Sequence, residues 1–145
     1  MIHNALRSQS SPVLNEPYSP AIKAGDFIYI SAQLPLSNGH SVPHTIQDET
    51  KQCIENMNAL LKEAGIDLSY VLHTTVYLKN MDDLKEMDSV YAGYFKKPYP
   101  ARTVIGVQEL DGDALVAIEG FAIDTRALDI LCAEDKDCTD KCCGL

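Results

Sequence analysis

Apolar and polar residues alternate with different periods along the chain, and the changes of period mark the predicted elements. Around residues 21–36 an alternating apolar pattern surrounds Lys23-Ala24-Gly25-Asp26, whose turn-forming residues predict a hairpin of two strands. From residue 46 onward, apolar side chains recur every three or four positions, as in an amphipathic helix. Thr45 is suited to cap the start of this helix, and Gly65 is suited to end it.

The second half of the chain repeats this change of period. Residues 71–78 alternate on a background of β-branched side chains, and a second helical stripe follows and ends before Pro98. The segments 103–110 and 114–123 flank Asp111-Gly112-Asp113, which predicts another hairpin. We therefore expect an α+β fold with the element order β-β-α-β-α-β-β.

The last predicted strand is apolar on both of its faces. Leu115, Ala117 and Phe121 fall on one face, and Val116 and Ile118 fall on the other. Two helices can cover only one face of a sheet, so the second face must be buried by a partner or leave a large apolar patch in water. The pattern therefore predicts a homo-oligomer.

Length and composition place this sheet in one domain. A chain of 145 residues is long enough for a substantial core, and we expect the domain to span residues 1–128, with 1–11 as a loose N-terminus. No apolar stretch approaches the ~20 residues of a membrane span, and no signal-peptide pattern precedes the first strand. We expect a cytoplasmic protein with no membrane partner.

The net charge of −9 argues against a nucleic-acid partner, because affinity for phosphate backbones comes mainly from Lys and Arg. No bound metal is expected either. His40 and His44 have the spacing of zinc ligands on a helix, but Pro43 lies between them and indicates a loop.

Residues 129–145 are expected to form an acidic, cysteine-rich tail, with five acids against two lysines. Its cysteines could bind a soft metal, become oxidised or belong to a disordered appendage. The last four residues, from Cys142, also have the outline of a prenylation box ending in leucine, which an intact-mass measurement would test. The tail cysteines are Cys132, Cys138, Cys142 and Cys143.

Two charged residues stand out on the predicted strands. Arg102 opens a strand otherwise rich in Val and Ile, where its fork of donors suits the carboxylate of a small metabolite. Glu119 interrupts an apolar strand and needs a partner. If Asp111 and Gly112 form a two-residue turn, Glu119 lies opposite Val104 and diagonal to Arg102, so the two could share one pocket. A purely structural salt bridge is the alternative for both.

These residues belong to segments that resemble the Rid family of reactive enamine/imine deaminases, also called the YjgF or L-PSP group. The resemblance covers about residues 12–125 and is carried by Pro17-Tyr18-Ser19-Pro20-Ala21, Ile30-Ser31-Ala32-Gln33-Leu34-Pro35, Thr74-Thr75-Val76-Tyr77-Leu78, Tyr99-Pro100-Ala101-Arg102 and Ile118-Glu119-Gly120-Phe121-Ala122. It implies a chorismate-mutase-like fold with two helices on one face of the sheet. It also implies a homotrimer around a central barrel, with sites in the clefts between subunits.

The resemblance also implies an activity, which is hydrolysis of 2-imino acids such as 2-iminobutanoate and 2-iminopropanoate to 2-oxo acids and ammonia without a cofactor. Arg102 would bind the substrate carboxylate, and a carboxylate on the last strand would help to place the attacking water. By the same carry-over, the remaining cleft residues are Tyr18, Ser31, Ala32, Tyr91 and Val104.

The chain departs from the family pattern at several of these positions. Ala117 stands where the family has its better-attested glutamate, and Glu119 is hypothesised to replace it. Ala32 stands for a glycine, Val104 for a cysteine and Asp88 for an asparagine. Two alternatives to an imine deaminase therefore remain. One is a non-catalytic protein that binds a small 2-oxo acid or similar carboxylate. The other is the endoribonuclease attached to the family's name, for which the sequence offers no basic groove.

Overall fold

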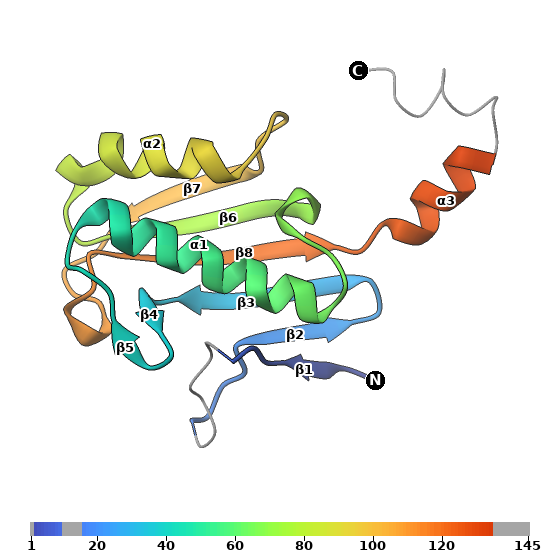
Figure 1. The fold of residues 1–145 in the computed structure, drawn as a ribbon, viewed down its shortest axis with the longest axis horizontal. Coiled ribbons are helices and arrows are strands. Elements are labelled where there is room, and N and C mark those ends of the chain that lie inside the picture. Colours follow the sequence, from blue (N-terminus) through green and yellow to red (C-terminus); the bar gives the residue numbers. More distant parts are fainter. Residues whose placement is uncertain (1, 10–15, 135–145) are drawn as a thin grey trace.

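The structure, a computed structural model, describes residues 2–9 and 16–134. A six-stranded sheet carries α1 and α2 on one of its faces, and α3 extends away from the sheet after its last strand (Figure 1). The sheet order is β1 (Asn4–Leu6), β2 (Ala21–Ala24), β3 (Phe27–Gln33), β8 (Val116–Ile123), β6 (Val71–Leu78) and β7 (Ala101–Gly106). The remaining elements are the small pair β4 (Leu36–Ser37) and β5 (His40–Ser41) and the helices α1 (Ile46–Glu63), α2 (Leu84–Tyr94) and α3 (Arg126–Glu134). Short 3₁₀ turns cover Leu68–Tyr70, Met81–Asp83 and Asp111–Asp113.

The predicted first helix is confirmed together with both of its ends. The Thr45 side chain accepts a hydrogen bond from the Asp48 backbone N–H at 3.1 Å, which satisfies one of the unpaired donors at the helix start. The helix ends before Gly65, whose φ of 80° is a conformation that residues with a Cβ rarely adopt. The apolar stripe of α1 packs on the sheet and is buried at Ile46, Cys53, Ile54, Met57, Leu60 and Leu61.

The core lies between the two helices and the covered face of the sheet. Every second residue of the central strands points into it, and full burial of each such side chain is worth roughly 1.5–3 kcal/mol. Gly120 makes room for the end of the Met57 side chain, because a Cβ at this position would lie 2.9 Å from the Met57 methyl carbon. The fully buried apolar residues of the sheet are Ile28, Val76, Leu78, Val116, Ile118 and Ala122.

The predicted hairpin between residues 103–110 and 114–123 is wrong. β7 instead pairs in parallel with β6, and β8 lies between β3 and β6 and is antiparallel to both. The physical reason is burial. β8 is apolar on both faces, and a central position buries more of it than a place at the edge of the sheet would. Asp111-Gly112-Asp113 forms a 3₁₀ turn within a longer loop that carries the chain back to the centre of the sheet.

The uncovered face of the sheet, opposite α1 and α2, displays aromatic residues, as the two-sided strand pattern predicts. Phe27 is 49% exposed and Tyr29 58% exposed. The Phe121 ring packs against both, at 6.0 Å and 5.0 Å between centroids. We call this side of the sheet the open face. The α+β fold with two helices on one face is confirmed.

The chain ends depart from two expectations. Asn4–Leu6 pair with β2, so this part of the expected loose N-terminus is ordered as an edge strand. The expected start of the tail at residue 129 falls inside α3, where Cys132 lies. Cys138, Cys142 and Cys143 lie outside the described residues. None of the helices in the described parts of the chain is long and apolar enough to cross a membrane.

Candidate functional site

Arg102 lines a cavity of about 370 Å³ between the start of β7 and the outer side of α2. Its Nη1 donates a hydrogen bond to Asp88 Oδ1 at 2.6 Å, and the guanidinium carbon lies 4.9 Å from the centre of the Tyr91 ring. The Arg102 side chain is 26% exposed, so it reaches the cavity surface without being surrounded by bulk water. The other lining residues are Ala92, Tyr99 and Pro100.

Tyr91 provides a rigid base for this arginine. Its ring is almost fully buried against Phe95, and its hydroxyl forms a hydrogen bond of 2.7 Å with Thr74 Oγ1. Burial raises the pKa of the Tyr91 hydroxyl, which stays neutral at physiological pH. The neutral ring offers its face to the guanidinium, a favourable cation–π arrangement. The strand and the helix together fix where Arg102 points.

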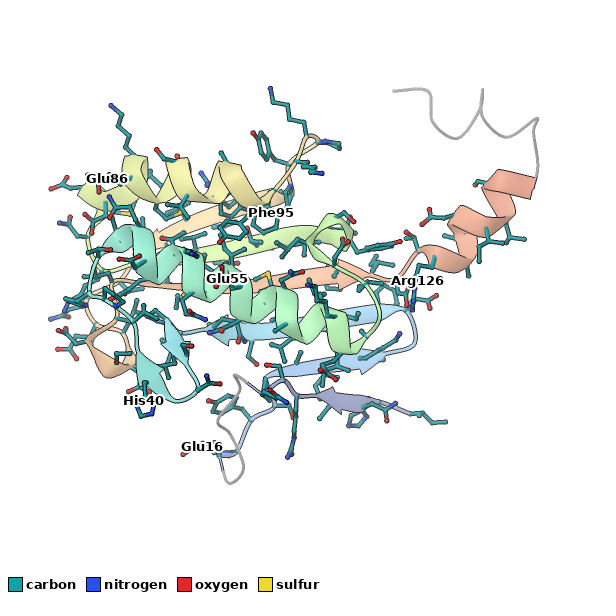
Figure 2. The ribbon with its side chains drawn as sticks, in the orientation of Figure 1. Glu16, His40, Glu55, Glu86, Phe95 and Arg126 are labelled. Carbon is teal, nitrogen blue, oxygen red and sulfur yellow. The ribbon has the colours of Figure 1, made fainter. Side chains whose placement is uncertain are left out.

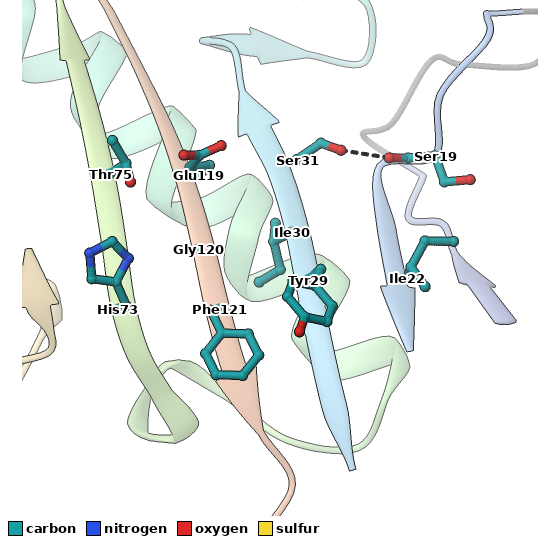
Figure 3. A pocket seen from close by; sticks show the side chains of 10 residues that line it. All are labelled: Ser19, Ile22, Tyr29, Ile30, Ser31, His73, Thr75, Glu119, Gly120 and Phe121. Atoms are coloured by element: carbon teal, nitrogen blue, oxygen red, sulfur yellow. Dashed lines mark hydrogen bonds between the residues drawn. The ribbon is translucent and has the colours of Figure 1, made fainter. Parts of the chain in front are cut away.

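A second cavity, of about 380 Å³, lies on the open face of the sheet. A row of polar side chains crosses neighbouring strands there (Figure 3), with Thr75 on β6, Glu119 on β8 and Ser31 on β3. Ser31 Oγ donates to the Ser19 carbonyl at 2.7 Å, which ties the segment before β2 to this row. A neighbouring row contains His73, Phe121 and Tyr29. We call the first set of side chains, with Ser19, the polar row.

Glu119 is held by a tyrosine that the sequence analysis did not single out. The Tyr77 hydroxyl donates to Glu119 Oε1 at 2.8 Å, and this hydrogen bond, more than burial, raises the pKa of Tyr77. Tyr77 pairs directly across the strands with Ala117, the position where the resemblance led us to expect a glutamate. Among the described residues that line this cavity, Glu119 is the one with a carboxylate.

The predicted placement of Arg102 and Glu119 in one pocket is wrong within a single chain. Thr75 pairs with Glu119 on one side and with Thr103 on the other, whereas Thr74 pairs with Gly120 and Arg102. Neighbouring residues of a strand point to opposite faces, so Arg102 lies on the helix side and Glu119 on the open face. The error follows directly from the wrong hairpin, which had placed β7 beside β8.

The structure separates the other predicted site residues into the same two groups. Tyr91 lies in the Arg102 cavity, and Val104 lies on the same face of β7 but packs against the core. Ser31 lies in the polar row. Ala32 and Tyr18 are exposed beside it, and neither lines one of these two cavities.

Sequence reasoning missed two contacts that complete these groups. Asp88 precedes Tyr91 by three residues on α2, so their shared helical face was a usable signal. Tyr77 alternates with Thr75 on β6, but its contact with Glu119 required the pairing of β6 with β8, which no local pattern indicates.

His44 lies elsewhere, bonded at 2.7 Å to the buried Glu49, which also accepts the Leu115 backbone N–H. These bonds stabilise the loop before β8.

The comparisons with known proteins agree with this architecture. The family model described as endoribonuclease L-PSP matches residues 8–124. A RutC family protein of Pyrococcus horikoshii is 43% identical over 117 residues, which cover 79% of this chain and 93% of that protein. The chain belongs to the L-PSP, or Rid, family.

Two further relatives connect this family to small amino-acid chemistry. The 2-iminobutanoate/2-iminopropanoate deaminase of Mus musculus is 35% identical over 125 residues, covering 85% of this chain and 93% of that protein. The crystal structure of E. coli TdcF with bound serine has a TM-score of 0.77 and 26% identity, covering 83% of this chain and 98% of that one. The family therefore includes proteins named as imine deaminases, and the predicted Rid resemblance is confirmed.

Proposed function

We propose that this protein hydrolyses 2-imino acids, such as 2-iminobutanoate and 2-iminopropanoate, to 2-oxo acids and ammonia. The observation that carries the proposal is Arg102, a rigidly mounted guanidinium facing a cavity of about 370 Å³, large enough for a four-carbon acid. Arginine binds carboxylates through two parallel hydrogen bonds, which fixes the orientation of a small acid. The deaminase name of the mouse relative and the serine bound in E. coli TdcF support a ligand with a carboxylate and a nitrogen on C2.

The proposed active site is shared between two copies of the chain. Arg102 and Glu119 lie on opposite faces of one sheet, so a site containing both needs Glu119 from a neighbouring protomer. The exposed aromatic residues Phe27 and Tyr29 on the open face supply an apolar surface for that neighbour. We propose a homotrimer, the assembly that the family resemblance implies; in such a closed ring every subunit makes the same contact with its neighbour.

The proposed reaction needs little help beyond positioning. A protonated imine is already electrophilic at C2, and water adds there while the Glu119 carboxylate accepts a proton from it, which gives a carbinolamine. Glu119 returns this proton to the nitrogen, the C–N bond breaks as the hydroxyl group becomes the carbonyl, and the hydroxyl proton leaves with the departing ammonia as ammonium. The 2-oxo acid is the other product, and Glu119 is again a carboxylate. Arg102 holds the carboxylate, Glu119 orients and deprotonates the water, and Tyr77 holds Glu119 in place. This mechanism requires neither a metal nor an organic cofactor.

A second candidate function is binding without turnover. One observation favours it, which is Ala117 at the position of the expected glutamate. The lack of a carboxylate there weakens the activation of water more than it weakens ligand binding. The ligand in this case would be a small 2-oxo acid or a similar carboxylate.

An ammonia-release assay separates the two functions. The substrate 2-iminobutanoate is generated in situ by oxidation of 2-aminobutanoate, because free imines hydrolyse within the time of a mixing experiment. Wild-type protein is expected to accelerate ammonia release, and Arg102→Ala to lower kcat/KM on the order of a hundredfold or more with unchanged thermal stability. The matched control is Arg7→Ala, an exposed arginine that lines neither cavity. Equal activity in Arg102→Ala and wild type would contradict the proposal, and binding without any turnover would favour the second function.

A further inference from the structure

Asp88 shares the Arg102 cavity and places a carboxylate where a ligand carboxylate must arrive. Its Oδ1 accepts from Arg102 Nη1 at 2.6 Å, and both side chains line the cavity. The Asp88 side chain is 45% exposed, so it faces the cavity and is not enclosed in the core. An anion that approaches the guanidinium therefore also meets a negative charge.

The charge of the ligand decides how strongly Asp88 weakens its binding. An isolated arginine attracts any carboxylate, whereas the Arg102–Asp88 pair has no net charge. A 2-oxo acid is a plain anion and is repelled by Asp88 in a partly desolvated cavity, where screening is weaker than in bulk water. A 2-imino acid with a protonated nitrogen has its positive charge on the group attached to C2, next to the carboxyl group, and that charge offsets the repulsion.

We propose that Asp88 is a specificity-determining residue that favours zwitterionic 2-iminium acids over anionic 2-oxo acids. The inference rests on the proposed function, in which the zwitterion is the substrate and the oxo acid is the product. Hydrolysis replaces the C=NH₂⁺ group by C=O, and the positive charge leaves with ammonium. The product that remains is a monoanion beside Asp88, so the same residue that admits the substrate promotes release of the product.

The test compares two stable probes by isothermal titration calorimetry. 2-Oxobutanoate is the anion, and 2-aminobutanoate has the positive nitrogen on C2. In Asp88→Asn the repulsion disappears, so the affinity for 2-oxobutanoate is expected to rise about tenfold. The affinity for 2-aminobutanoate is expected to fall or to change by less than about threefold, because the loss of its partner charge opposes the gain. The quantity that decides is the ratio of the two affinities.

Two controls isolate Asp88 from a general change in net charge. Glu86→Gln removes the same charge from the same helix, but Glu86 lies in the first turn of α2 (Figure 2), and its carboxylate is bonded to Gln47. This variant is expected to leave the affinity ratio unchanged. In an Arg102→Gln background, 2-oxobutanoate is expected not to bind measurably with either Asp88 or Asn at this position, because the attracting charge is gone, so Asp88→Asn is expected to give no measurable gain there.

Three results would overturn the inference. They are an affinity ratio in Asp88→Asn within about twofold of wild type, a gain that persists without Arg102, or no binding of either probe to Asp88→Asn. Failure of the proposed function is a separate result, seen as no ammonia release by the wild-type protein. If the protein has no deaminase activity but the affinity ratio shifts as expected, the proposed reaction is refuted and the charge selectivity of the cavity is retained.

Discussion

Two arginine–aspartate pairs in this protein are built in opposite ways. Arg126 donates from Nε and Nη2 to both carboxylate oxygens of Asp124, at 2.8 and 2.7 Å. It also donates to the backbone carbonyls of Gly65 and Ala64 at 3.1 and 3.2 Å. Within residues 2–9 and 16–134, the Arg102 side chain donates a single hydrogen bond, from Nη1 to Asp88. The first arginine has most of its donors bonded within the fold, and the second lines a cavity.

The difference supports a structural role for Arg126 and the proposed ligand-binding role for Arg102. Arg126 joins the end of β8 to the turn after α1, and its Asp124 partner is only 9% exposed in its side chain. Arg102 is mounted on Tyr91 with donors to spare, which a fold-stabilising ion pair does not require. This contrast is the main reason to prefer a binding role for Arg102 over the surface salt bridge that its sequence position also allowed.

The largest expected effect is the recovery of activity when two inactive variants are combined in one oligomer. Arg102→Ala and Glu119→Gln are each expected to be nearly inactive. If one site takes Arg102 from one protomer and Glu119 from the next, mixed oligomers contain sites with both residues intact. Random equal mixing of two variant chains in a ring gives about a quarter of sites in that state. Co-expressing the two variants should therefore restore about a quarter of wild-type ammonia release.

The control for this experiment is a double variant that has both changes in one chain, mixed with wild type in equal amounts. It forms the same fraction of intact sites, about a quarter, from wild-type neighbours alone. No recovery in the mixture of single variants, with recovery in this control, would contradict a site shared between protomers and would require a rearrangement within one chain.

A smaller effect is expected from Tyr77, which acts through Glu119. Tyr77→Phe removes the hydrogen bond to the Glu119 carboxylate, so kcat is expected to fall about tenfold while KM changes by less than about twofold. The split between kcat and KM is informative, because Tyr77 does not contact the Arg102 cavity where the substrate carboxylate binds. In a Glu119→Gln background the same substitution is expected to have no further effect. Additive losses would assign Tyr77 a separate role.

The smallest expected effect concerns stability and tests the structural pair. The hydrogen bond from Arg126 holds the pKa of Asp124 well below its ordinary value, with a smaller contribution from Lys23. Asp124→Asn is therefore expected to lower the free energy of unfolding by about 1–2 kcal/mol at pH 7, with kcat/KM unchanged. A lowered folded-state pKa stabilises the protein above the unfolded value near 4 and loses that effect as pH falls.

Denaturant unfolding at a series of pH values checks this sign. The gap between wild type and Asp124→Asn should be constant from about pH 5 to 7 and should narrow progressively below about pH 4. A gap that stays constant to pH 2.5 would show that the carboxylate charge contributes nothing and that the asparagine disturbs packing instead.

Local pattern was sufficient for most elements of the fold. Thr45 and Gly65 define α1 because capping and positive φ depend on the residue itself and its nearest neighbours. Tyr91 could be assigned to the inner stripe of α2, and Arg102 to the start of β7, for the same reason. The hairpin after β7 failed because the Asp-Gly-Asp turn suits two connections equally, and only the burial of both faces of β8 decides between them.

The sequence by itself determined the α+β class, the two covering helices and the uncovered apolar face. It also identified Arg102 and Glu119 as the unusual charged residues of the strands. Only the tertiary structure decided that these charges lie on opposite faces, that Asp88 pairs with Arg102 and that Tyr77 holds Glu119. The physical reason is range. Helix caps, turns and alternation depend on residues a few positions apart, whereas the order of strands depends on burial summed over the whole sheet, and a one-strand change in that order moves every contact of the site.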